Sequence, residues 1–328
     1  MPHNTSLRGG SMVLAAIFVV GLLAPWLAPY DPTEQIDAVA GKHRPPLTVM
    51  PAIHFADRGW KLAERVERTP EGLVVYNLGS HRQYGASTIL NLDEDGVRDQ
   101  RVFLLGTDKF GRDVLSRLVH GARVSLLIGI LSVILALTIG VTVGALAALG
   151  GRWLDNLLMR FVDGMLTIPW IFLLIALTAL FVTDTWMLIL LLGGTVWPTI
   201  SRLTRAELMG LRNRDFVLAA RGLGLTEVGI LFRHMLPNAM TPLMVSATLT
   251  VGNLILVESS LSFIGFGVQP PNASWGNMIA DGQGVLLTQW WVAGFPTAAL
   301  VITVVAINLV GEGLRDVLDP RNAQQVGT

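Results

Sequence analysis

Residues 219–237 read AARGLGLTEVGILFRHMLP, a polar stretch punctuated by glycine that lies between two strongly apolar runs. Apolar residues dominate the whole chain: 52% of its 328 residues are hydrophobic, only 15% are charged, and the mean hydropathy is +0.54. These values are typical of membrane proteins and unlike those of soluble domains. The stretch is therefore expected to connect two membrane-spanning helices.

The residue inventory excludes several classes of protein. The 24 basic and 24 acidic residues balance, so no overall basic field indicates a nucleic-acid partner. The chain has no cysteine, which excludes disulfides, thiolate metal sites and a cysteine nucleophile. Its histidines are scattered without metal-ligand spacing, and we expect neither a metal site nor a catalytic residue.

Six charge-free windows are about long enough to cross a bilayer, whose core needs roughly 20 apolar residues in helical form. The sequence thus predicts an all-α polytopic membrane protein with six transmembrane helices. The first window could instead be a cleaved signal peptide, although its apolar run is long for one and it lacks a small-x-small cleavage site. The windows are 11–30, 124–149, 164–182, 186–200, 239–257 and 290–310.

Arginine sets the expected orientation, because short loops rich in Lys and Arg stay on the cytoplasmic side. The connection between the fourth and fifth windows, 201–238, carries six arginines, whereas 259–289 carries no Lys or Arg. The opening stretch is therefore expected to face the cytoplasm. With six spans, both termini are expected to be cytoplasmic as well.

Residues 31–103 form one long insertion that this topology places outside the cytoplasm. Its prolines, short β-like runs such as GLVVYNL (72–78) and the acidic turn DEDG (93–96) favour a small subdomain of mixed or β-rich character. The insertion could contact a partner or be passive, and the sequence favours neither.

The opening stretch predicts two short helices with a tight turn between them. Asp215 is expected to cap the first helix, and the glycines at 222 and 224 to end it. Thr226 is expected to cap the second helix, and Pro237 to end it. A DNA-binding helix-turn-helix has similar spacing, but the adjoining spans would hold its recognition helix against the bilayer. A passive amphipathic loop on the membrane surface is the other alternative.

A longer stretch, DFVLAARGLGLTEVGILFRHMLPNAMTP (215–242), resembles the cytoplasmic coupling loop of binding-protein-dependent ABC importer permeases. In that family two short helices dock into a groove on the ATP-hydrolysing subunit. The resemblance implies a coupling loop over 214–237 and departs from the family at Leu218, where glutamate is usual. The residues that it marks are Asp215, Ala219, Ala220, Gly224, Ile230, Arg233, His234, Leu236, Pro237 and Asn238.

Two further stretches narrow the resemblance to one subfamily. LLGTDKFGRDVLSRLVHGARVSLLIG (104–129) is similar to the signature of the second permease subunit in dipeptide, oligopeptide and nickel importers. VESSLSFIGFGVQPPNASWGNMI (257–279) is similar to an extracytoplasmic segment of the same subunits. The resemblance covers the first span and about 104–320 but not the insertion. Its extracytoplasmic signature residues are Gly106, Thr107, Asp108, Gly111, Arg112 and Asp113.

The signature region and the span that follows it can also be interpreted from the chemistry of their residues alone. Residues 113–123 place apolar side chains on one side and basic ones on the other, as a helix lying at the membrane interface would. Arg112 and the two signature aspartates could form an ionic site, but we expect them to cap that helix and anchor it at the lipid headgroups. In the second span, Gly140 and Gly144 suit close helix packing, either within the chain or against a partner.

The chain contains no phosphate-cradling G-x-x-x-x-G-K-[ST] motif, and its only Gly-Lys pair, at 41–42, is followed by histidine. We therefore expect a transport subunit without enzyme activity or a cofactor of its own, ATP and magnesium being held by partner subunits. The resemblance implies four kinds of partner: a homologous second permease, two ATP-binding-cassette ATPases, an extracytoplasmic solute-binding protein and membrane lipid. It places the chain in the bacterial inner membrane as one half of a pore, with a di- or oligopeptide as the expected solute.

Two alternatives stay open. A secondary transporter driven by an ion gradient needs ionisable residues at membrane depth, whereas Glu258 and Glu312 lie only at span ends, where solvated or hydrogen-bonded roles are expected. The second alternative is an ABC permease for nickel or another small solute. A membrane-anchored binding module would leave five spans unexplained. The expected organisation is a tail and first transmembrane helix (1–30), the insertion (31–103), a permease core with five transmembrane helices (104–313) and a cytoplasmic tail (314–328).

Overall fold

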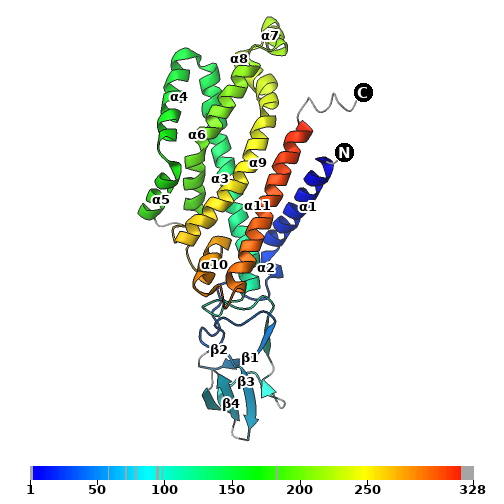
Figure 1. Ribbon diagram of the computed structural model, residues 1–328, viewed down its shortest axis with the longest axis vertical. Helices are drawn as coiled ribbons and strands as arrows, with labels where there is room; N and C mark the ends of the chain where they lie inside the picture. Colours follow the sequence, from blue (N-terminus) through cyan, green and yellow to red (C-terminus); the bar gives the residue numbers. More distant parts are fainter. Residues whose placement is uncertain are drawn as a thin grey trace. The chain divides into compact units, whose positions relative to one another are not determined.

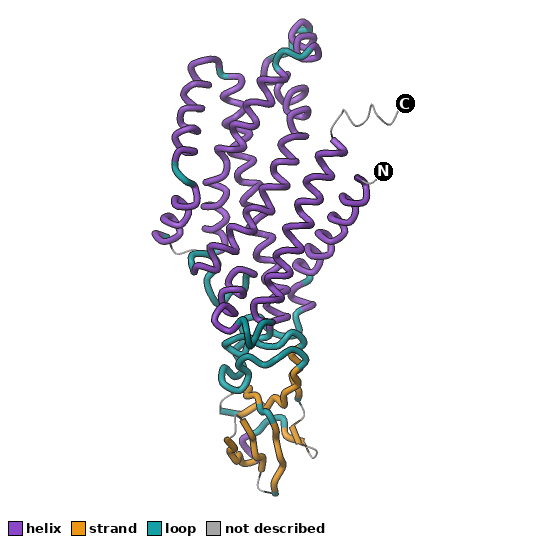
Figure 2. Tube along the Cα trace, in the orientation of Figure 1, coloured by secondary structure: helices purple, strands orange, loops and turns teal. Residues whose placement is uncertain are grey.

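The computed structural model describes residues 3–318 apart from 58, 71, 78–79, 94–95, 98 and 182–183. The chain folds into two compact units. Unit 1 comprises Met1–Phe18, Ser125–Val268 and Leu300–Thr328, and unit 2 comprises Val19–Val124 and Gln269–Ala299. Helices dominate unit 1, and the described strands all lie in unit 2 (Figure 2). Of the predicted tail, 314–328, residues 314–318 belong to the last helix and the others lie outside the described residues.

Long helices build unit 1, and three of them continue into unit 2. Within unit 1, α6 contacts α4, α5 and α9 (Figure 1). The interfaces are filled by buried side chains such as Trp197, Ile200 and Leu243. The helices are α1 (His3–Leu22), α3 (Val114–Leu149), α4 (Gly151–Thr167), α5 (Trp170–Leu180), α6 (Thr185–Leu211), α7 (Asp215–Gly222), α8 (Glu227–Ile230), the π-helical turn η2 (Leu231–Met235), α9 (Leu236–Ile264) and α11 (Trp291–Leu318).

Four helices among the described residues are long and apolar enough to cross a membrane: α3, α6, the continuous run Glu227–Ile264, and α11. The pair α4 and α5 adds a fifth if a bent pair counts as one span, and α1 contributes a shorter apolar stretch, Leu7–Leu22. The structure thus supports four or five spans by length and composition. The predicted number of six is not confirmed.

The third predicted span, 164–182, is wrong as a single straight helix. The axes of α4 and α5 differ by 78°, and the break falls at Ile168 and Pro169, whose ψ angles of 124° and 106° are extended. Proline has no N–H to donate and disfavours the helical conformation in the residue before it. Pro169 therefore ends α4. Residue 182 lies outside the described residues.

The prediction of a separate interfacial helix at 113–123 is also wrong. These residues from 114 onward are the first turns of α3, a single helix of 36 residues. The stretch contains no proline, so the amphipathic start and the apolar continuation form one element. A Cβ added to Gly121 would lie 3.1 Å from the Trp275 ring, which shows that the start of α3 comes close to α10 (Trp275–Gly282) within unit 2.

The insertion is β-rich, as the sequence predicted. GLVVYNL forms strand β4 over Gly72–Asn77, and the acidic turn lies between the paired strands β6 (Leu92–Asp93) and β7 (Gly96–Val97), its residues 94 and 95 being outside the described ones. One sheet has the order β2-β1-β8 and another β3-β4-β5, and neighbouring strands are antiparallel. The remaining strands are β1 (Thr48–Phe55), β2 (Gly59–Leu62), β3 (Arg65–Thr69), β5 (Ser80–Gly85) and β8 (Gln100–Phe103).

Two small apolar clusters hold the insertion together. One contains Met50, Leu62 and Phe103, all nearly inaccessible. The other contains Ile53 and Leu73, which come from two different sheets. Alternation along β1 places Met50 and Ala52 in the first cluster and Ile53 and Phe55 in the second, so one strand serves both cores.

Candidate functional site

The turn between α7 and α8 is a complete Schellman motif. The N–H of Gly224 donates to the carbonyl of Arg221 at 2.9 Å, and the N–H of Leu225 donates to the carbonyl of Ala220 at 3.2 Å. These two bonds satisfy carbonyls that the end of α7 would leave without partners. Gly224 adopts φ +82°, a left-handed conformation that glycine takes without penalty. The local sequence therefore dictates a sharp turn at this position.

The start of α8 is fixed by two side-chain contacts. Thr226 caps the helix as predicted, with its Oγ1 accepting from the N–H of Gly229 at 3.2 Å. Arg221 of α7 grips the carboxylate of Glu227 with two hydrogen bonds of 2.6 and 3.0 Å. Bidentate arginine–carboxylate pairs fix geometry in a way that single contacts do not, so this pair links α7 to the start of α8.

The inner face of this element belongs to the core of unit 1. Val217, Ala220, Ile230, Leu231 and Met235 are buried in one cluster with side chains of α3, α4, α6 and α9. Apolar burial of this kind is the main source of cohesion in a fold. The segment 214–237, which we call the α7–α8 segment, is thus seated on the long helices that it connects.

The outer face of the α7–α8 segment exposes six large apolar side chains. Leu223, at the tip of the turn, is 83% exposed, and Leu218, where the resembling family usually has glutamate, is 49% exposed. Contiguous exposed apolar side chains mark interaction surfaces on proteins. The exposed large apolar residues of the segment are Phe216, Leu218, Leu223, Leu225, Val228 and Phe232.

Two capping predictions for this segment are wrong. Asp215 makes no side-chain cap: it is the first residue of α7, where its charge still suits the positive end of the helix. Pro237 does not end the second helix, because the chain runs on through η2 into α9, with the proline in the first turn of α9. Proline is tolerated there because the first N–H groups of a helix need no intrahelical partner.

The structure scatters the other marked residues over both faces. Ala219, Arg233 and Asn238 are exposed, and His234 and Leu236 are half-buried. The amide of Asn238 donates to the carbonyl of His234 at 2.6 Å, next to the π-helical turn. Ala220 and Ile230 act from within the core, so only part of the marked set can touch a partner.

The signature residues near 106–113 form a tight loop in unit 2. Gly106 and Gly111 have φ angles of +81° and +76°. The hydroxyl of Thr107 donates to the carbonyl of Gly41 at 2.5 Å and accepts from the N–H of Arg44 at 2.7 Å. This loop therefore holds the chain that enters the insertion.

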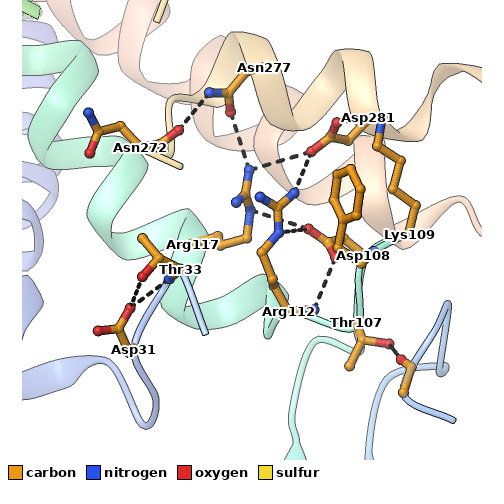
Figure 3. Close-up of polar contacts among 12 residues, drawn as sticks. Asp31, Thr33, Thr107, Asp108, Lys109, Arg112, Arg117, Asn272, Asn277 and Asp281 are labelled. Atoms are coloured by element: carbon orange, nitrogen blue, oxygen red, sulfur yellow. Dashed lines mark hydrogen bonds and ion pairs between the residues drawn. The ribbon is translucent and has the colours of Figure 1, made fainter. Parts of the chain in front are cut away.

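A buried ion cluster lies beside this loop (Figure 3). Arg112 donates to Asp108 at 2.6 Å and to Asp281 at 2.9 Å, and Arg117 approaches both carboxylates at 3.5 Å. Arg112 is 3% exposed, so the expectation that it anchors at lipid headgroups is wrong. Two carboxylates flank two guanidinium groups because a buried charge needs a partner. The cluster ties the signature loop to α10.

Of the two signature aspartates that were expected to cap a helix, only Asp113 does so, and the helix is α3. Asp113 accepts hydrogen bonds from the N–H and the hydroxyl of Ser116, both at 2.7 Å, and so caps the start of α3. Burial raises the pKa of the Asp113 carboxyl above its usual value, and the bonds from Ser116 oppose that shift. Asp108 accepts from the N–H groups of Phe110 and Arg112 and closes the loop instead of capping a helix.

The glycines of the second span lie against α6. A Cβ on Gly140 would meet Ile200 at 2.8 Å, and a Cβ on Gly144 would meet the carbonyl of Ser201 at 2.6 Å. From the opposite side, a Cβ on Gly193 of α6 would meet the carbonyl of Ser132 at 2.8 Å. Close backbone approach between small residues is a typical packing mode of membrane helices, and here it acts within the chain.

Sequence reasoning missed Asp281, and for Glu258 it expected a solvated or hydrogen-bonded role but not the serines that enclose it. Glu258 is fully buried in α9 and accepts from the hydroxyls of Ser262 at 2.7 Å and Ser125 at 3.1 Å. The four-residue spacing of Glu258 and Ser262 was a usable signal, since it places both on one helix face. Asp281 lies 169 residues from Arg112 in the sequence, so no local sequence pattern could predict this ion pair. No group of metal-ligating side chains occurs among the described residues.

Comparison with known proteins adds the family. Residues 140–324 match the family described as binding-protein-dependent transport system inner membrane component. Residues 3–46 match the N-terminal TM domain of oligopeptide transport permease C. Among solved structures, the inward-facing MetNI methionine ABC transporter aligns with a TM-score of 0.51 and 23% identity over 62% of this chain and 96% of that chain, a likeness of fold.

Two relatives extend these matches. A peptide permease protein of Brucella suis is 48% identical over 218 residues, 66% of this chain and 72% of that protein. The di/tripeptide transport system permease protein DppC of Pseudomonas aeruginosa is 37% identical over 319 residues, 97% of this chain and 89% of that protein. The second alignment spans the insertion, where the sequence alone suggested no resemblance. The chain therefore belongs to the inner-membrane permease components of binding-protein-dependent ABC transport systems.

Proposed function

We propose that this chain is one half of the pore of an ABC importer that carries di- or oligopeptides. Membership of the permease family supports the transport role. The peptide substrate is supported by relatives named as peptide and di/tripeptide permeases and by the match of residues 3–46. A homologous permease would complete the pore, and an extracytoplasmic binding protein would deliver the solute.

The α7–α8 segment is the proposed docking element for an ATPase subunit. The observation that carries this proposal is its two-sided construction: a buried inner face continuous with the core and an outer face of exposed apolar side chains. Because α6 and α9 join directly to its ends, a push on the segment would tilt these helices as rigid bodies. Such a movement would switch access to the pore, with ATP and magnesium held by the partner subunits.

The proposed topology has six crossings, with the bent pair α4 and α5 as one of them and α1 as another. Both termini and the α7–α8 segment would then lie in the cytoplasm. The six arginines between 201 and 238 support this orientation, since basic residues favour the cytoplasmic side. Leu218 would make an apolar contact with the ATPase where a glutamate elsewhere in the family would make a polar one.

Affinity isolation of the tagged chain from its own membranes tests the proposal, with the co-purifying chains identified by mass spectrometry. We expect two ATPase copies and a second permease. Leu223→Glu places a charge on the tip of the turn and should remove the ATPases from the isolated complex. Leu287→Glu, a matched change at a 99% exposed leucine of unit 2, should leave them bound.

The outcome that would refute the docking proposal is a wild-type chain recovered alone from active membranes. Retention of the ATPases by Leu223→Glu would also count against the α7–α8 segment. Peptide uptake is tested separately in cells, by comparing accumulation of a labelled dipeptide with and without the transporter.

A further inference from the structure

The insertion contains a cleft to which the permease function assigns no role. Its volume is about 360 Å³, which falls within the range of small-molecule sites, about 300–1,000 Å³. Side chains of β1, β2, β4 and β5 line it, together with the loop that precedes β1. Charge and apolar surface in this lining come from, among others, Asp37, Phe55, Lys61, Val75, Arg82 and Tyr84.

One face of the β4–β5 hairpin forms a wall of the cleft. Val75 is paired with Arg82 in the antiparallel register, and Tyr84 lies two residues along β5. Directly opposed residues share a face, and so do residues two apart on one strand. The Tyr84 ring packs on Phe55, with ring centroids 4.7 Å apart. The wall therefore offers apolar surface with one arginine in it.

One amide side chain connects two of the strands that line the cleft. The Nδ2 of Asn77 donates to the carbonyl of Leu62 at 2.9 Å, and its Oδ1 accepts from the N–H of Glu64 at 2.9 Å. These bonds join the end of β4 to the chain that leaves β2. A site whose walls are already fixed spends less free energy on ordering when a ligand arrives.

Charges of both signs line the cleft. One oxygen of the Asp37 carboxylate accepts from the N–H groups of Val39 and Ala40, both at 3.0 Å, which fixes its orientation. Lys61 and Arg82 are exposed, and neither forms an ion pair with any residue that the structure describes. A ligand that carries both an ammonium and a carboxylate would match this set.

We propose that this cleft binds a short peptide with free ends, its carboxylate at Lys61 and Arg82, its ammonium at Asp37 and its apolar side chains on Phe55, Val75 and Tyr84. Strand β5 lies at the edge of its sheet, and an edge strand offers backbone N–H and C=O groups to an extended peptide. This inference rests on the proposed peptide substrate. It gives the insertion a peptide-holding role of its own.

Equilibrium dialysis with labelled leucyl-leucine tests the cleft, using the complete detergent-solubilised transporter without its binding protein. The double variant Lys61→Gln/Arg82→Gln should weaken binding about four- to twenty-five-fold, since each exposed charge pair contributes roughly a factor of two to five. Arg65→Gln, an exposed arginine of the same subdomain that does not line the cleft, is the matched control and should bind as the wild type does.

The C-terminal amide of leucyl-leucine distinguishes recognition of the carboxylate from non-specific binding. It lacks the carboxylate, so we expect it to bind the wild type and the double variant equally weakly. Absence of saturable binding to the wild type would overturn the inference, and so would equal affinities of the two proteins for the free dipeptide.

Uptake of the same dipeptide in cells distinguishes this inference from the proposed function. Normal uptake by the wild type without binding at the cleft would overturn the cleft and leave the peptide importer standing. Charge-dependent binding without uptake would support the cleft and refute the proposed solute.

Discussion

Replacing Gly144 with alanine should force α3 and α6 apart. The added Cβ would lie 2.6 Å from the carbonyl oxygen of Ser201, 2.7 Å from Cβ of Thr204 and 3.1 Å from the backbone nitrogen of Arg205. Ordinary contact begins at 3.4 Å, so the helices must separate by roughly 0.8 Å. Backbone atoms cannot turn away as a flexible side chain can. Overpacking of this kind costs about 1–3 kcal/mol.

Helix propensity acts in the opposite direction and calls for a matched control. Alanine stabilises a helix by about 1 kcal/mol relative to glycine, so Gly144→Ala should lower the free energy of unfolding by about 0–2 kcal/mol. Gly194 lies in α6 with no atom within 4 Å of an added Cβ. Gly194→Ala should therefore show the propensity gain alone. The expected difference between the two variants is about 1–3 kcal/mol.

Equilibrium unfolding in mixed detergent micelles measures this difference, with the intrinsic fluorescence of the nine tryptophans as the signal. Gel filtration establishes first that both variants are folded and monodisperse. A Gly144→Ala protein as stable as Gly194→Ala, or more stable, would refute the close approach of α3 and α6 at this position.

Two other substitutions test the α7–α8 segment and the ion cluster. Gly224→Ala forces a side chain into the left-handed conformation at φ +82°, which costs about 1–2 kcal/mol, and this change should reduce the peptide-stimulated ATPase activity of the assembled transporter. The control is Gly222→Ala, which lies in right-handed helix with equal free space and should not reduce that activity. Equal ATPase activities of the two variants would contradict the docking geometry. Asp281→Asn leaves two buried arginines with one carboxylate and should lower the free energy of unfolding by about 3 kcal/mol, the low end for a buried pair because Asp281 is 16% exposed. Lys109→Gln removes a more exposed partner of the same carboxylate and should cost at most about 1 kcal/mol. Similar losses for both variants would refute the cluster as the joint between the signature loop and α10.

Local features of the structure were readable from the sequence because they depend on a few consecutive residues. The Thr226 cap, the turn at Gly224 and the strand at 72–77 follow from side-chain chemistry and backbone preference over one or two turns of chain. The long helices follow in the same way from runs of apolar residues. Their exact limits were less predictable, as the bend at Pro169 and the uninterrupted start of α3 show.

Amino-acid composition and hydropathy by themselves determined that this is a helical membrane protein. Prolines, short β-like runs and an acidic turn indicated the β-rich insertion, and three ordered motifs pointed to the family. Only the tertiary structure decided which residues meet: that Asp281 completes the cluster around Arg112, that Glu258 is enclosed by serines, and that Gly144 touches α6. The reason is physical. Propensity and hydropathy act through neighbours along the chain, whereas the burial and pairing of a charge depend on segments that folding brings together from far apart.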